Sequence, residues 1–137
     1  MIHPCIVGLG IDIVETGRME SVLARWGRRF KDRIFLADEQ RYCEGKAFPC
    51  SHYAGRFAVK EAVTKAFGTG VGPDIGWLDI EVTRDAGSGA PSVRLSGRVG
   101  ALAEARGVSG VLVSLSHTRG YAVAQALLVG RSEGCPR

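Results

Sequence analysis

The chain has 137 residues, of which 45% are hydrophobic, and this is enough to bury the core of one domain. No apolar run approaches the roughly 20 residues of a membrane span, and the N-terminus lacks the basic start and cleavage site of a signal peptide, so we expect a cytoplasmic protein without a membrane partner. The formal net charge of +4 is small for a nucleic-acid binder, so the placement of the charges matters more than their number.

The cysteines are not arranged as a metal site. The chain has 4 cysteines and no CxxC pair. Cys43, Cys50 and His52 do not match the ligand spacing of a common zinc site. We therefore expect reduced, structural thiols.

The first predicted element is a strand over residues 5–14, where apolar and β-branched residues run almost without interruption. Asp12 interrupts this run. A carboxylate at this position either caps the end of the strand or binds a ligand. Gly8 and Gly10 would allow another backbone or a ligand to approach the strand closely.

A helix is predicted next, over residues 16–30. Its apolar arc includes Val22, and Arg18, Arg25 and Arg29 fall beside that arc within a narrow sector. Such a ridge of positive charge is either an ordinary solvated face or a surface for an acidic partner. A short helix over residues 36–44 and a loop to residue 51 follow.

The most unusual stretch is the helix predicted over residues 53–67, with Ser51 as its cap. It is apolar almost all the way round and is therefore expected to be buried. It nevertheless carries Lys60, Glu61 and Lys65. Buried charges are costly unless they are paired or bound to an ion, so we expect these to have a use. A structural ion pair between Glu61 and Lys65, one turn apart, is the simplest alternative.

A glycine-rich run, Gly68-Thr69-Gly70-Val71-Gly72, ends this helix and leaves backbone N–H groups for an anion. The run follows a helix and does not lie between a strand and a helix, which argues against a dinucleotide-binding fold.

The rest of the chain predicts strands joined by hairpins. The expected elements are strands over 77–84, 92–96, 111–116 and 121–129 and a helix over 97–106, with a tight turn from His117 to Gly120. We therefore predict a single compact α+β domain over residues 1–129, a mostly antiparallel sheet packed with helices around one long buried helix. Residues 130–137 are expected to form a flexible tail.

Asp12 and Glu61 are carboxylates from distant segments, and Lys65 lies one turn from Glu61. This combination indicates a magnesium site, because magnesium is often held by one or two carboxylates together with substrate phosphates. Such an ion neutralises charge that grows on a leaving phosphate. One polyphosphate substrate could be lined by the glycine run, Thr64, Lys65, Ser116, His117 and Thr118. The residues alone thus predict magnesium-assisted chemistry on a phosphorylated ligand.

Three motifs, in this order and spacing, resemble those of the bacterial holo-acyl-carrier-protein synthases, the small single-repeat class of 4′-phosphopantetheinyl transferases. They are Gly10-Ile11-Asp12-Ile13, the stretch from Arg56 to Ala66 with its glycine run, and Ser114-Leu115-Ser116-His117-Thr118. The likeness spans roughly residues 5–129. Leu36 departs from it, since many members have a threonine there, and the loop 45–51 and residues 130–137 are particular to this chain.

The resemblance implies an enzyme of fatty acid biosynthesis that transfers 4′-phosphopantetheine from coenzyme A to a serine of acyl carrier protein and releases adenosine 3′,5′-bisphosphate. It implies that Asp12 and Glu61 hold magnesium against the pyrophosphate. It also implies that Lys65 binds phosphate, with proton donation as a second role. Together with Thr64 and Lys65, the residues implied to bind coenzyme A are Arg56, Gly68, Thr69, Gly70, His117 and Thr118.

The resemblance also implies a homotrimer with each site at a subunit boundary, and docking of the acidic carrier protein on Arg18, Val22, Arg25 and Arg29. An alternative is a basic α+β module that binds nucleic acid or a phosphorylated ligand without catalysis. The predicted strands lack the row of aromatic residues that stacks on bases, so we expect no nucleic-acid partner.

Overall fold

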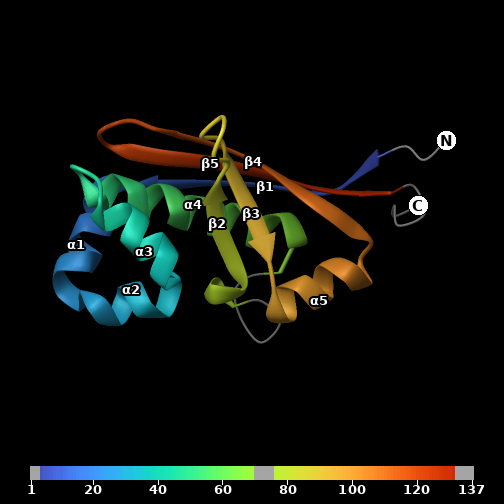
Figure 1. The fold of residues 1–137 in the computed structure, drawn as a ribbon, viewed down its shortest axis with the longest axis horizontal. Helices are drawn as coiled ribbons and strands as arrows, with labels where there is room; N and C mark the ends of the chain where they lie inside the picture. The colour runs from blue at the N-terminus through green and yellow to red at the C-terminus, as the bar shows by residue number, and fades with distance from the viewer. Residues whose placement is uncertain (1–3, 70–75, 132–137) are drawn as a thin grey trace.

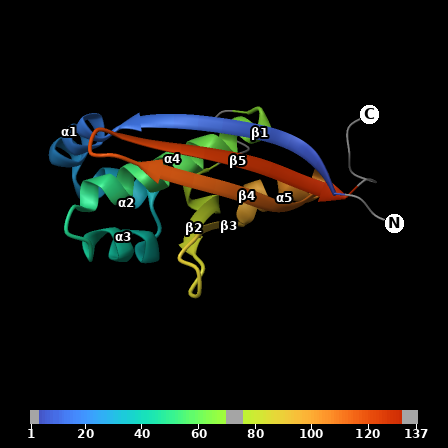
Figure 2. The ribbon, with the colours of Figure 1, turned by 90° about the horizontal axis from the view of Figure 1, so that it is seen from above.

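A long central helix, α4 (Pro49–Phe67), lies across one face of a three-stranded antiparallel sheet (Figures 1 and 2). The computed structural model describes residues 4–69 and 76–131. The sheet has the order β1-β5-β4, with β1 at Pro4–Glu15, β5 at Tyr121–Arg131 and β4 at Val108–His117. The second sheet is a hairpin of β2 (Ile80–Arg84) and β3 (Pro91–Leu95).

The remaining helices lie around the two ends of α4 (Figure 1). Near its N-terminal end are α1 (Thr16–Trp26), α2 (Arg28–Ile34) and α3 (Ala37–Glu44). The single 3-10 turn η1 (Trp77–Asp79) leads into the hairpin, and α5 (Gly97–Ala105) connects the hairpin to β4. The predicted α+β class and the long buried central helix are therefore confirmed.

Small residues on the strands allow α4 to lie directly on the sheet. A Cβ atom on Gly10 would fall 1.9 Å from the Ala62 carbonyl oxygen, and one on Gly8 would fall 2.0 Å from that of Ala66. The predicted close approach at these two glycines is thus confirmed. Since side chains alternate along a strand, Asp12 faces α4 with the two glycines.

The helix predicted over residues 16–30 is wrong in one respect, because it consists of two helices that meet at Gly27. The backbone of Gly27 has a φ of 51°, in the left-handed region that favours glycine. Its N–H donates to the Leu23 carbonyl oxygen and so ends α1. Arg29 therefore lies on α2, whereas Arg18 and Arg25 lie on α1.

Several other boundaries differ from the prediction. Helix α4 begins at Pro49, before the predicted cap Ser51, because proline is well tolerated in the first turn of a helix. Strand β5 continues to Arg131, because its last residues pair with β1 and β4, so the predicted tail does not begin at residue 130. Residues 132–137 and 70–72 lie outside the described residues.

The expectation of reduced thiols holds for Cys43 and Cys50, which are free, but not for Cys5, which is disulfide-bonded. Strand pairing places the Cys5 sulfur 3.5 Å from the carbonyl oxygen of Arg131, at the C-terminal end of β5. Burial raises the pKa of the Cys43 thiol to about 12, so this cysteine is inert and structural.

Lys60, one of the charges predicted on the central helix, is fully buried and has several partners. Its ammonium donates to Glu39 Oε1 at 2.7 Å, to the Ile34 carbonyl at 2.8 Å and to the Trp77 carbonyl at 3.0 Å. Glu39 in turn accepts the backbone N–H of Val82 at 3.0 Å. This network connects α4 to α2, α3, η1 and β2, so Lys60 is a structural residue.

Candidate active site

Asp12, Glu61 and Lys65 come together where the second half of β1 faces α4. The Lys65 ammonium lies 2.9 Å from Asp12 Oδ1 and 3.1 Å from the Ile11 carbonyl oxygen. The simple alternative, a Glu61–Lys65 ion pair, is not among the ion pairs of the described residues. The packing of α4 on β1 therefore brings the Asp12 carboxylate into an ion pair with Lys65. The Glu61 carboxylate, although on the same helix as Lys65, makes no such pair in the described residues.

The electrostatics of this group favour a cation. Burial raises the pKa of Glu61, and the neighbouring Asp12 carboxylate raises it further. Two carboxylates that repel one another present hard oxygen ligands, which is the donor set that magnesium prefers. Among the described residues, no group of three or more His, Cys, Asp and Glu side chains is placed to hold a metal ion.

These residues line a cavity of about 530 Å³, which we call the carboxylate cavity. Its other walls are largely apolar and come from β1, β5, α1, α2 and α4, and they include Met19, Val22, Phe30 and Phe57. Glu15, at the end of β1, is a further acidic residue of the lining. Arg18 also lines it. Two of the residues predicted to bind the carrier protein, Arg18 and Val22, thus border the same cavity as the predicted metal ligands.

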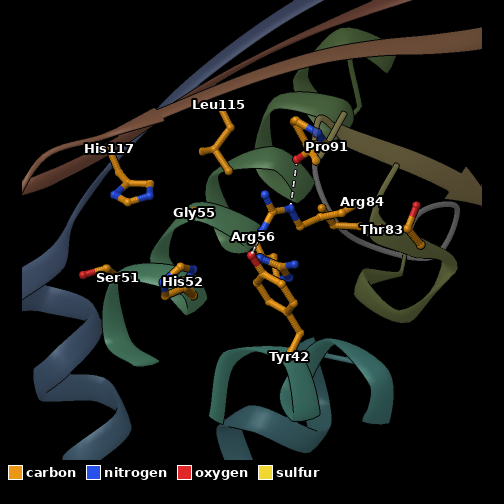
Figure 3. A pocket seen from close by; sticks show the side chains of 12 residues that line it. Tyr42, Ser51, His52, Gly55, Arg56, Thr83, Arg84, Pro91, Leu115 and His117 are labelled. Carbon is orange, nitrogen blue, oxygen red and sulfur yellow. Dashed lines mark hydrogen bonds between the residues drawn. The ribbon is translucent and has the colours of Figure 1, made fainter. Parts of the chain in front are cut away.

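A second cavity, of about 270 Å³, lies between α4, the β2–β3 hairpin and the end of β4 (Figure 3). Arg56 and His117 line it together with Arg84 and His52, and no acidic side chain of the described residues does so. We call it the basic cavity. Burial lowers the pKa of His52, and the nearby His117 and Arg56 lower it further. The excess of positive charge indicates a site for an anion.

That one polyphosphate substrate is lined by Lys65 together with Ser116, His117 and Thr118 stays a prediction. Within one chain, no described residue lines both cavities. The reason is the topology of the sheet. The carboxylate cavity lies beside β1 and the basic cavity beside β4, and these are the two outer strands, with β5 between them.

The other described residues that were predicted to bind coenzyme A line neither the carboxylate cavity nor the basic cavity. Thr64 is 1% exposed and its hydroxyl donates to the Glu61 carbonyl at 2.8 Å, so this side chain faces neither cavity. Gly68 ends α4 with a φ of 76°, as predicted, and Thr69 has a buried hydroxyl without a partner among the described residues. Thr118 lines a neighbouring cavity that shares His117 with the basic one.

Tyr42 and Arg84 were not predicted as residues of the site, and His52 was considered only as a zinc ligand. Tyr42 lies in α3, between the two departures from the resemblance at Leu36 and in the loop 45–51, and Arg84 lies at the end of β2. A cluster of cationic and aromatic side chains from separate segments has no local pattern, so no signal in the sequence indicates it.

This α+β domain has a pair of carboxylates beside a lysine, and a basic cavity on the other side of the same helix. These are the parts of a group transferase that acts on a phosphorylated substrate. A family model described as the 4′-phosphopantetheinyl transferase superfamily matches residues 8–126. The holo-[acyl-carrier-protein] synthase of Ruminiclostridium cellulolyticum is 46% identical over 121 residues, which are 88% of this chain and 90% of that protein. The holo-[acyl-carrier-protein] synthase of Syntrophus aciditrophicus is 42% identical and aligns over 95% of this chain and 98% of its own.

Solved structures agree. The holo-[acyl-carrier-protein] synthase of Neisseria meningitidis superposes with a TM-score of 0.84 at 30% identity, over 90% of this chain and 98% of that one. The Helicobacter pylori enzyme in complex with coenzyme A superposes with a TM-score of 0.78 at 32% identity, over 88% and 98% of the two chains. The chain therefore belongs to the holo-[acyl-carrier-protein] synthase family, and the predicted family is confirmed. None of the described helices is long and apolar enough to cross a membrane.

Proposed function

We propose that this chain transfers 4′-phosphopantetheine from coenzyme A to a serine of an acyl carrier protein and releases adenosine 3′,5′-bisphosphate. The observation that supports it best is the meeting of Asp12, Glu61 and Lys65 at one cavity. The relatives are named for this activity, and solved relatives include complexes with coenzyme A. In the reaction, the serine oxygen forms a bond to the phosphorus that carries the pantetheine arm, and the bond from that phosphorus to the bridging oxygen breaks.

Asp12 and Glu61 would hold magnesium, which when bound would neutralise the charge of the pyrophosphate. The hydrogen bond to Asp12 raises the pKa of Lys65, so its ammonium stays charged at neutral pH. We therefore assign Lys65 the binding of a phosphate oxygen in preference to the delivery of a proton. The apolar walls of the carboxylate cavity would exclude water from the reacting phosphorus.

Arg56 and His117 would hold the nucleotide in the basic cavity, with Thr118 in the neighbouring cavity that shares His117. The predicted ligands Gly68 and Thr69 lie at the C-terminal end of α4, away from this cavity, and Gly70 lies outside the described residues. A homotrimer would bring the basic cavity of one subunit near the carboxylate cavity of another, and the sheet supports this part of the proposal. Its face opposite α4 is apolar and exposed, with Ile11 60% exposed on β1 and Leu112 60% exposed on β4. Such a patch is typical of an interface. Sedimentation of the wild-type chain as a monomer would contradict the trimer.

The activity is tested with coenzyme A that carries a label in the pantetheine arm. We expect label on an apo acyl carrier protein, and none after removal of divalent metal with a chelator or with a carrier protein whose acceptor serine is alanine. Binding of coenzyme A without any transfer of label would contradict the proposed function and favour a binding module. The cytoplasmic location stays a prediction.

The carrier protein is proposed to dock on Arg18, Val22, Arg25 and Arg29, and Arg25→Glu tests the charged part of this surface. Arg25 is exposed on α1 and stacks on Trp26, with its guanidinium carbon 5.1 Å from the ring centroid. An exposed ionic contact contributes about 0.2–1 kcal/mol, and reversing the charge adds a repulsion of about the same size. The KM for carrier protein should therefore rise roughly two- to thirtyfold. The KM for coenzyme A should not change.

The matched control is Arg41→Glu, the same change of charge at an exposed position on α3. Added salt should weaken carrier-protein use by the wild type more than by Arg25→Glu, because exposed charges are screened. If Arg25→Glu and Arg41→Glu used carrier protein equally well at low salt, the arginine ridge would be an ordinary solvated face.

A further inference from the structure

Tyr42, near the end of α3, contacts cationic side chains from three other segments, of which Figure 3 shows Arg56 and Arg84. The guanidinium carbon of Arg56, on α4, lies 3.7 Å from the centroid of its ring. The Lys46 ammonium lies 4.6 Å from the same centroid. Arg84, at the end of β2, donates a hydrogen bond from Nη1 to the Tyr42 hydroxyl. One aromatic side chain therefore connects the central helix, the hairpin and the loop after α3.

Arg56 depends on this ring because it has no anionic partner in the described residues. Its side chain is 5% exposed, it makes no ion pair there, and its Nε has no hydrogen-bond partner. A buried charge is costly unless something compensates it. The negative face of an aromatic ring attracts a guanidinium without occupying its N–H groups. Tyr42 thus stabilises Arg56 and leaves its donors free for a ligand.

Arg84 is held by two contacts at once. Its Nε donates to the Gly89 carbonyl oxygen at 2.9 Å, which fixes it to the hairpin turn, and its Nη1 donates to Tyr42. The two guanidinium groups therefore share Tyr42 as a common support, one through the face of the ring and one through the hydroxyl. Two arginines held in this way suit a phosphate dianion, since guanidinium groups match phosphate oxygens in geometry and charge.

We propose that Tyr42 is a positioning residue for phosphate recognition, which holds Arg56 and Arg84 where their free N–H groups meet the 3′-phosphate of coenzyme A. This inference rests on the proposed function and deepens it. Tyr42 touches the two arginines and needs no contact with the ligand. Its loss should therefore impair the discrimination between coenzyme A and dephospho-coenzyme A, which differ only in that phosphate.

The test measures the Kd of both nucleotides by calorimetry for the wild type, Tyr42→Leu and Tyr42→Phe. Tyr42→Leu removes the ring and the hydroxyl and should weaken coenzyme A binding about tenfold, with dephospho-coenzyme A changed less than about twofold. Tyr42→Phe keeps the ring under Arg56 and loses only the hydrogen bond to Arg84. Its affinity for coenzyme A should therefore fall between those of the wild type and Tyr42→Leu. The kcat at saturating coenzyme A should be close to that of the wild type for both variants, because the carboxylate cavity is untouched.

Equal weakening of the two nucleotides by Tyr42→Leu would overturn the inference, since a merely structural role does not distinguish them. Loss of affinity for coenzyme A in Tyr42→Phe as large as in Tyr42→Leu would also overturn it, because the ring would then contribute nothing. Either result leaves transfer by the wild type intact, so failure of this inference is distinguishable from failure of the proposed function.

Discussion

Replacement of Asp12 or of Glu61 by alanine is expected to lower the rate of pantetheine transfer at least roughly 100- to 1,000-fold, the range seen when a group that stabilises transition-state charge is removed. The physical reason is the loss of one of the two carboxylates proposed to hold the metal. Transfer of labelled pantetheine at several magnesium concentrations measures the effect, and binding of Mn²⁺ followed by electron paramagnetic resonance reports the site without turnover.

Both variants should remain folded. Asp12→Ala removes only the pair with Lys65, whose side chain is 53% exposed, so this pair contributes little to stability. Each substitution also relieves the repulsion between the two carboxylates. Glu104→Ala, which removes an exposed acid on α5, is the matched control and should transfer normally. Near-normal turnover of Asp12→Ala at limiting magnesium would show that this carboxylate does not hold the metal.

Lys60→Met is expected to lower the free energy of unfolding by about 3–5 kcal/mol, because it leaves the buried Glu39 carboxylate without its cation. Lys60 and Glu39 have side chains 0% and 1% exposed, so water cannot replace the missing partner. Urea denaturation measures the change, at one fixed protein concentration because assembly would make stability depend on it.

Two further variants separate charge from packing. Lys60→Met with Glu39→Gln should recover part of the loss, because the buried charge is gone and an acceptor for the Val82 N–H remains. Lys31→Met is the control, since Lys31 pairs with Glu44, whose side chain is 48% exposed, and its loss should cost only about 1 kcal/mol. Equal losses of stability in Lys60→Met and Lys31→Met would exclude the buried pair as a major support.

Local patterns in the sequence were sufficient for the central helix and for the face of β1 that carries Asp12. The apolar circumference of α4 required burial, and Gly68 had the conformation needed to end it. Alternation along β1 placed Asp12 on the same face as Gly8 and Gly10, and those glycines brought α4 against that face. These properties depend on residue type and short spacing, which a sequence contains directly. The family motifs depend on them too.

Only the tertiary structure decided which charges meet. Lys60 pairs with Glu39 on another helix, and Lys65 pairs with Asp12 and not with Glu61 on its own helix. Periodicity places a side chain on one side of its element but does not determine which distant element packs there, since that depends on the shape of the whole core.

The two cavities depend on topology in the same way. The strand order β1-β5-β4 separates Asp12 from His117, although both belong to motifs of one family. The periodicity predicted one helix over residues 16–30, but the φ of 51° at Gly27 divides it into two. The sequence does not show this, because glycine can either continue a helix or end it. The support of Arg56 by Tyr42 comes from helices that pack side by side, and no local spacing in the chain encodes that contact.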